Sequence, residues 1–212
     1  MHVSEGVLSA PVLIGGAAVA AAGVFYGLKK LDGEAMVSAA LVTAAFFVAS
    51  LVHLPLGPAS VHLVLNGLVG LVLGWGAFPV IFTGLLLQAL LFQYGGLTTL
   101  GVNTVVMAAP AVCVAFFLGP LAGRRGKMGA FASFGCGALS VALSSVLLAG
   151  ALIFTGENFR VIALASVVGN LPVMAVEGFF TAFIISFLLK VYPEMLPGLR
   201  IDQIPFSEKE VA

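Results

Sequence analysis

The chain has 212 residues, of which 61% are hydrophobic and 8% charged, and nine Lys and Arg balance nine Asp and Glu. Soluble domains carry about three times as many charges, so this chain could not cover its surface as a soluble globule, a coiled coil or a disordered segment. Zero net charge also provides no basic face for nucleic acid. The composition predicts an all-α integral membrane protein with no room for a separate catalytic domain.

The apolar stretches divide into membrane helices, each of which needs about 20 residues to cross the hydrocarbon core. The stretch 61–92 is too long for one crossing. Within it, Gly74-Trp75-Gly76-Ala77-Phe78-Pro79 has the glycine, proline and aromatic residues typical of a turn at the membrane surface. The sequence therefore predicts about seven transmembrane helices: 8–28, 35–52, 61–73, 78–93, 102–121, 128–154 and 161–190. Asn170 and Pro172 are expected to kink the last of them.

The cations predict the orientation of these helices. With seven helices and the N-terminus outside, only Arg160 among the nine cations faces outward, as the positive-inside rule requires. Six helices would move Lys29 and Lys30 outside. Residues 1–28 have no cation before the apolar run, which predicts an uncleaved anchor rather than a signal peptide. We expect one transmembrane domain, 1–212, with an outer tail (1–7), a helical bundle (8–190) and a cytoplasmic tail (191–212).

The three histidines of the chain are all expected on the outer side. His2 lies in the N-terminal tail, His53 and His62 flank a short outer loop, and His62 is expected to begin the third helix. The seven residues before the first helix could extend about 20 Å. The N-terminus could therefore fold back over the bundle and meet His62.

A histidine at position 2 can form a metal chelate with the chain terminus. The α-amine of Met1, the amide nitrogen of His2 and its imidazole would lie in one plane, and one further nitrogen would complete a square. Square-planar nitrogen sites suit Ni(II) or Cu(II), and His62 is the natural fourth donor. Spacing alone does not separate such a site from a histidine that stands at position 2 by chance.

Three ordered segments resemble a known transport family: Met-His-Val-Ser-Glu-Gly (1–6), Pro-Leu-Gly-Pro-Ala-Ser-Val-His-Leu-Val-Leu-Asn-Gly (55–67) and Gln88 to Thr104. The family is that of the nickel/cobalt substrate-binding membrane subunits (S components) of energy-coupling-factor ABC transporters, the NikM/CbiM type. The resemblance implies that Met1, His2 and His62 hold the metal. Ala59-Ser60-Val61 departs from the Thr-Ser-Gly of some members, which leaves the choice between the two metals open.

The resemblance also implies a function for the chain and a set of partner subunits. It would capture Ni(II), or alternatively Co(II), in the cell (plasma or inner) membrane, with no cofactor beyond the transported ion. Its partners would be a transmembrane coupling subunit, cytoplasmic ATPase subunits and a small additional membrane subunit. Transport would proceed by reorientation or gating.

Other polar residues at membrane depth are candidates for supporting roles. His53 has two possible roles. It is either an interfacial histidine that is hydrogen-bonded to a loop carbonyl, or a group that lies beside the metal or its entry path. Placing the carboxylate of Glu177 inside a membrane costs free energy, so such a residue is taken to have a function. It could accept a hydrogen bond from a ligating imidazole, or it could brace a helix joint beside Gly178. The amides at membrane depth are expected to bond each other or groups around the ligands: Asn66, Gln88, Asn103 and Asn170. Asn66 is expected one helical turn after His62, on the same face of the helix.

No enzyme motif is present. The sequence has neither H-E-x-x-H nor G-x-S-x-G, and Gly123-Arg-Arg-Gly-Lys-Met128 lacks the spacing of a phosphate-binding loop. ATP hydrolysis would fall to partner subunits. The alternative function is a metal-free channel or proton-coupled carrier that uses Glu177 and the amides. Pairs such as Gly23/Gly27 and Gly70/Gly74 allow close helix approach, either within the bundle or against a second subunit.

Overall fold

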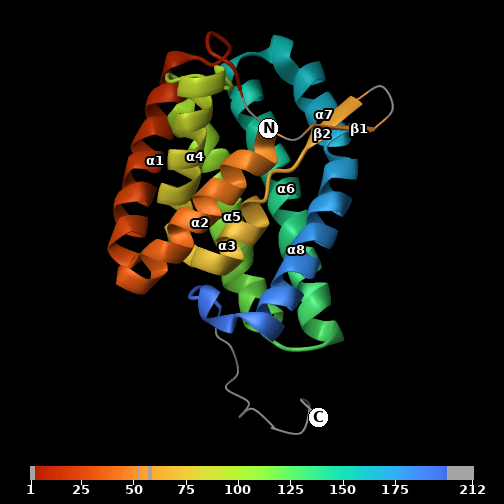
Figure 1. The fold of residues 1–212 in the computed structure, drawn as a ribbon. Coiled ribbons are helices and arrows are strands. Elements are labelled where there is room, and N and C mark those ends of the chain that lie inside the picture. The colour runs from red at the N-terminus through yellow and green to blue at the C-terminus, as the bar shows by residue number, and fades with distance from the viewer. Residues whose placement is uncertain (1–2, 52, 57–58, 200–212) are drawn as a thin grey trace, which may run out of the picture.

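The computed structural model describes residues 3–51, 53–56 and 59–199, and only the backbone at Glu34 and within 53–62. The chain forms a helical bundle with one short hairpin at its edge (Figure 1). The helices are α1 (Ala10–Lys30), α2 (Gly33–Leu51), α3 (Asn66–Leu73), α4 (Ala77–Phe92), α5 (Leu100–Ala122), α6 (Lys127–Thr155), α7 (Arg160–Gly169) and α8 (Leu171–Val191), and the strands are β1 (His53–Leu56) and β2 (Ala59–His62). The all-helical class of the prediction is confirmed.

The chain reverses direction between α3 and α4. Asn66 and Gly70 of α3 lie against Met107 and Ala111 of α5, so these two helices run the same way. Helix α4 instead runs parallel to α2, since its residue Gln88 bonds to Ser50 near the end of α2. The predicted turn is therefore present, as a 3-10 turn at Gly74–Gly76 that begins with a left-handed glycine, φ 53°.

Five segments of the described chain are long and apolar enough to cross a membrane: Ala10–Lys30, Asn66–Phe92, Leu100–Ala122, Lys127–Thr155 and Glu157–Val191. The segment Asn66–Phe92 includes the reversal at Gly74–Gly76, and α2 is a shorter apolar helix. Helices α7 and α8 are separate in the structure, because the regular helix is interrupted at Asn170, just before Pro172. The interruption predicted at Asn170 and Pro172 is confirmed, whereas the number of spans and their orientation stay predictions.

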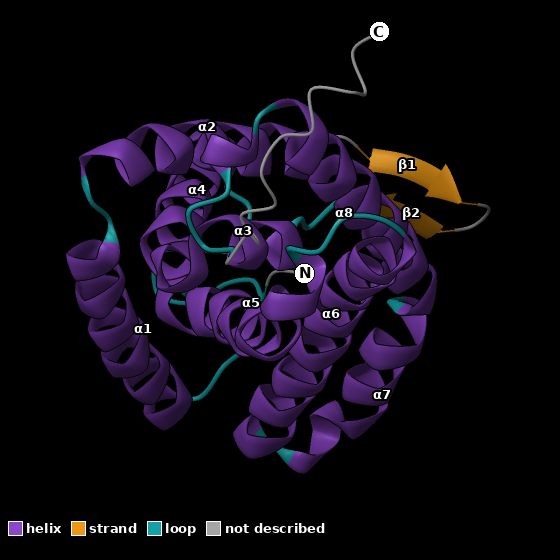
Figure 2. Cartoon of the chain, turned by 90° about the horizontal axis from the view of Figure 1, so that it is seen from below, coloured by secondary structure: helices purple, strands orange, loops and turns teal. Residues whose placement is uncertain are grey.

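Helix α3 is the short central element of the bundle, and all eight of its residues are buried. Figure 2 shows α3 and α5 inside the ring of helices, with α1 and α7 at the periphery. A methyl group at Gly67 would meet the carbonyl of Cys136 in α6, and one at Gly70 would meet the carbonyl of Ala111 in α5. These two glycines let three backbones approach more closely than side chains would allow.

The segment before α3 differs from the prediction. Residues 59–62 form a strand rather than the start of a helix, and α3 begins only at Asn66. The prediction that His62 begins a helix was therefore wrong, and so was the placement of Asn66 one helical turn after His62 on the same face. In the antiparallel pair β1–β2, the backbone of His62 lies directly opposite that of His53.

Candidate metal centre

The N-terminal segment is held against the start of α5 by its backbone. The Val3 N–H donates to Asn103 Oδ1 at 3.0 Å, and Asn103 Nδ2 donates back to the Val3 carbonyl at 3.1 Å. Thr99 Oγ1 donates to the same carbonyl at 2.9 Å. Further along, the Thr98 N–H donates to the carboxylate of Glu5 at 3.2 Å. The residue that follows His2 is thus fixed in the protein interior, where Thr99 and Asn103 are buried.

The far end of the same segment is tied to α6, as the Ser9 N–H donates to Thr155 Oγ1 at 3.3 Å. Val3 and Leu8 are buried in a cluster with Val102, Leu148 and other apolar residues. The tail therefore folds back over the bundle as expected. Whether it meets His62 lies outside the described residues.

Glu177 in α8 binds the backbone immediately before α3. Its carboxylate is fully buried, with 0% exposure, and accepts from the Leu65 N–H at 2.9 and 3.0 Å. It also accepts from the Val64 N–H. A carboxylate near the amino end of a helix is stabilised by the backbone N–H groups and the helix dipole. Glu177 therefore braces the junction between β2 and α3, two residues after His62.

One face of α5 connects the two anchored segments. Thr99, Asn103 and Met107 recur every four residues and so lie above one another on one side of the helix. The first two hold Val3, and the Met107 carbonyl accepts from Asn66 Nδ2 at 3.3 Å. Asn66 Nδ2 also donates to Ser144 Oγ of α6 at 2.9 Å. The N-terminal segment and the start of α3 are thus fixed within about one or two turns of each other along α5.

The structure tests some of the predictions about the site and not others. Met1 and His2 lie outside the described residues, as do the side chains of His53 and His62, so the ligand set stays a prediction. Of the readings of Glu177, bracing of the chain is observed, through backbone amides rather than beside Gly178 itself. In the described chain, no group of three or more His, Cys, Asp and Glu side chains could share a metal ion.

The amides were expected to bond each other or groups around the ligands, and Asn103 does the second through Val3, the neighbour of His2. Asn66 bonds to Ser144 and a carbonyl, Asn103 to Val3 and Thr99, and Asn170 to the carbonyl of Ser166 in the preceding helix α7; none of these three bonds to another of the amides. Gln88 Nε2 donates to Ser50 Oγ at 2.6 Å, at the end of α2 just before the hairpin.

Sequence reasoning missed the hydroxyl partners Thr99, Ser144 and Ser50. The available signal was spacing, because Thr99 stands four residues before Asn103 and so shares its helix face. No comparable signal joins Ser144 to Asn66 or Ser50 to Gln88, since these pairs come from separate helices.

Fold and contacts together define a multi-pass helical membrane protein that fixes its own N-terminal segment in its interior. A family profile described as "Cobalt uptake substrate-specific transmembrane region" (CbiM) matches residues 2–195. The chain belongs to this CbiM family, as the resemblance of its three segments implies. The family is one of transport components and not of enzymes.

Relatives and solved structures agree with this membership. The chain is 38% identical to a "Putative metal transport protein" of Haemophilus influenzae, over 92% of this chain and 97% of that one. It is 29% identical to the "Fused nickel transport protein NikMN" of Rhodobacter capsulatus, over 97% of this chain and 66% of that fusion. A crystal structure of a transition metal transporter superposes with a TM-score of 0.76 at 24% identity, over 90% of this chain and 93% of that one, which supports the fold.

Proposed function

We propose that this chain is the substrate-specific membrane subunit of an energy-coupling-factor transporter and captures Ni(II), or alternatively Co(II), from outside the cell. The Met1 amine, the amide and imidazole of His2, and the imidazole of His62 would be the ligands. The transported ion is the substrate, and no resident cofactor is needed.

The observation that carries this proposal is the anchoring of both ligand-bearing segments to one region of the bundle. Thr99 and Asn103 hold the backbone one residue after His2, and Glu177 holds the backbone two and three residues after His62. Metal ligands bind best when the groups behind them fix their positions. In this chain, main-chain hydrogen bonds hold the neighbouring residues Val3, Val64 and Leu65, which would suit ligands that include main-chain nitrogens.

The partners follow from family membership. The Rhodobacter capsulatus relative is a fusion of which this chain matches 66%, so a second transport component is covalently attached there. We infer that here a small membrane subunit, a transmembrane coupling subunit and cytoplasmic ATPases are separate chains. The outer tail (1–7), the bundle (8–190) in the cell membrane and the cytoplasmic tail (191–212) form one unit.

The alternative of a metal-free channel or proton-coupled carrier has no specific observation in its favour. Its central residue, Glu177, is engaged with the Val64 and Leu65 amides. The buried amides Asn66 and Gln88 donate to serine hydroxyl groups of neighbouring helices, and Asn103 donates to the hydroxyl group of Thr99 at the start of its own helix.

The test is the metal content of purified protein with its native, untagged N-terminus. We expect one Ni(II) or Co(II) per chain by elemental analysis after incubation with an equimolar mixture, and a competition titration ranks the two metals. A protein that is folded and untagged yet binds neither ion would contradict the proposal.

A further inference from the structure

A cavity lies at the end of the bundle opposite the N-terminal segment, where α5 ends, α6 begins and α8 ends. Its volume is about 340 Å³. The lining residues come from the loop between α5 and α6 and from the last turns of α8: Arg124, Arg125, Gly126, Ser186, Leu189 and Lys190. No residue of this cavity takes part in the candidate metal centre.

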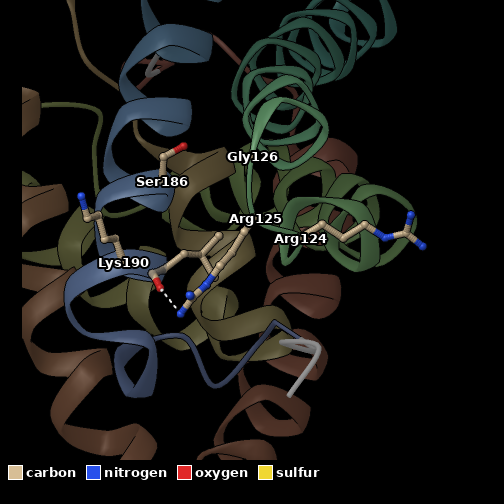
Figure 3. A pocket seen from close by; sticks show the side chains of 6 residues that line it. Arg124, Arg125, Gly126, Ser186 and Lys190 are labelled. Carbon is tan, nitrogen blue, oxygen red and sulfur yellow. Dashed lines mark hydrogen bonds between the residues drawn. The ribbon is translucent and has the colours of Figure 1, made fainter. Parts of the chain in front are cut away.

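The lining of this cavity is strongly basic. Three of its six residues are cations and none is a carboxylate. In the described chain, the ion pair between Arg160 and Glu157 is at the other end of the bundle, and neither Arg124 nor Lys190 has a carboxylate partner. Arg125 is anchored across the cavity, since its guanidinium donates to the Leu189 carbonyl at 3.5 Å (Figure 3).

Figure 3 shows how the cations are arranged. Arg125 extends towards the last turn of α8, whereas the side chains of Arg124 and Lys190 point away from Arg125 on opposite sides. Ser186, one turn earlier on α8, presents its hydroxyl group beside Gly126. The long stems of Arg124 and Lys190 allow their charged ends to turn towards an anion that enters between them.

The depth of the cavity follows from the helices that form it. Residues 123–126 join two membrane-spanning segments, Leu100–Ala122 and Lys127–Thr155, and Lys190 is in the last turn of a third. The cavity therefore lies at the boundary between hydrocarbon and water. Beside it, Met128 and Phe131 of α6 and Phe187 of α8 are exposed, Phe131 by 75%. These apolar side chains would face acyl chains.

We propose that this cavity binds the phosphate group of an anionic membrane phospholipid. Basic pockets between transmembrane helices attract such headgroups, and the apolar residues beside this pocket would contact the acyl chains of the same molecule. A free phosphate ion would gain nothing from Phe131 and Phe187. A protein partner would need a broad surface, whereas this cavity is small and recessed.

The test measures how strongly a spin-labelled phosphatidylglycerol associates with the full-length protein in phosphatidylcholine nanodiscs, from the motionally restricted fraction in the electron spin resonance spectrum. Each cation near the membrane surface contributes roughly fivefold to such binding. The double variant Arg124→Gln with Lys190→Gln should therefore bind the lipid about 25-fold more weakly. The charge-preserving pair Arg124→Lys with Lys190→Arg should restore most of the binding.

The matched control is Lys29→Gln with Lys30→Gln, which removes the same charge at the same end of the bundle. Lys29 and Lys30 lie over the rings of Phe25 and Tyr26 and do not line the cavity. Equal loss in both double variants would show a general surface effect and overturn the proposal. Displacement of the lipid by millimolar inorganic phosphate would assign the cavity to a soluble anion. Unchanged lipid binding together with lost capture of the coupling subunit would assign it to a protein contact.

Discussion

Asn103 binds both polar groups of one backbone residue, since its amide oxygen accepts from the Val3 N–H and its amide nitrogen donates to the Val3 carbonyl. Thr99 adds a second donor to that carbonyl. Ordering a free chain end costs about 1–2 kcal/mol per residue, and buried hydrogen bonds of this kind contribute about 1 kcal/mol each. These contacts offset the cost of fixing the chain just after His2, so a metal would meet a partly ordered terminus.

Removing this clamp should weaken metal binding without unfolding the bundle. In Asn103→Ala, the Val3 N–H and carbonyl lose two hydrogen bonds, and we expect roughly 10- to 100-fold weaker affinity, as for other groups that orient metal ligands. Asn170→Ala is the control, because the side chain of Asn170 donates to the Ser166 carbonyl one turn earlier and is remote from Val3. Calorimetric titration with Ni(II) checks both variants, and equal affinities for the two would show that the clamp does not serve the site.

His62 and His53 are the two candidates for the fourth metal ligand. We expect His62→Ala to abolish most metal binding and His53→Ala to retain most of it. The reason is that Glu177 fixes the backbone two and three residues after His62, which preorganises a ligand there. Because the two backbones lie opposite each other in the hairpin, both substitutions disturb the same element and serve as mutual controls. The opposite ranking in a titration would make His53 the ligand.

Residue-level prediction succeeded where a residue type has a narrow range of uses. A carboxylate or amide inside a membrane must find a partner, so the sequence indicates that Glu177 and Asn103 are hydrogen-bonded, as observed, while their roles in metal binding stay predictions. Their partners are backbone groups distant in sequence, such as Leu65 and Val3. Any residue supplies an N–H, so no side-chain pattern marks these positions.

At the scale of elements, the turn at Gly74–Gly76 was predictable and the hairpin was not. Glycine and proline restrict the backbone at a turn. A short apolar run such as residues 61–65 instead fits a strand, an extended segment or a helix equally well. The position where the helix begins is decided by Glu177 of α8, which binds the Val64 and Leu65 N–H groups. These bonds favour a helix that begins at Asn66.

Helix α3 depends on close approach at its glycines. In Gly70→Ala, the new methyl group would overlap the Ala111 carbonyl of α5, and overpacking of this kind costs about 1–3 kcal/mol. Gly15→Ala in α1 is the matched control, because nothing lies within 4 Å of a methyl group there and alanine is the better helix former. We expect a lower thermal midpoint in detergent for the first variant only. Equal midpoints would mean that α3 shifts without cost.

On the scale of the whole molecule, the candidate metal centre and the basic cavity lie at opposite ends of the bundle. Val3 and Ser9 lie at the end where α5 begins and α6 ends, and the basic cavity lies at the other end. The distribution of cations in the sequence predicts which end faces the cytoplasm, because helix packing by itself favours neither orientation.

Cysteine labelling in intact cells checks this orientation. In a background with Cys113→Ser and Cys136→Ser, we expect Ser4→Cys and Glu157→Cys to react with an impermeant reagent. Lys29→Cys and Arg125→Cys should react only after the membrane is opened, because the positive-inside rule places cations in the cytoplasm. Reaction of Ser4→Cys only in opened cells would reverse the predicted topology.

The chain terminus distinguishes the proposed chelate from every metal-free alternative, because only a chelate needs the α-amine of Met1. Val3 is fixed, so one added residue moves the amine about 3.5 Å further from the clamp and converts the Met1 amine into an amide. His2 would then be the third residue, where an amine, two amides and one imidazole fill a square-planar site. A one-residue extension should therefore bind Ni(II) independently of His62.

A long N-terminal tag should abolish native binding and uptake, because it leaves no amine near His2. A C-terminal tag should be harmless, since Gly198 lies at the opposite end of the bundle, where its N–H donates to the Val72 carbonyl at 2.7 Å. Uptake assays at equal membrane levels compare the untagged, N-tagged and C-tagged proteins, with His62→Ala in each background. Full uptake by an intact N-tagged protein would exclude the α-amine of Met1 as a ligand.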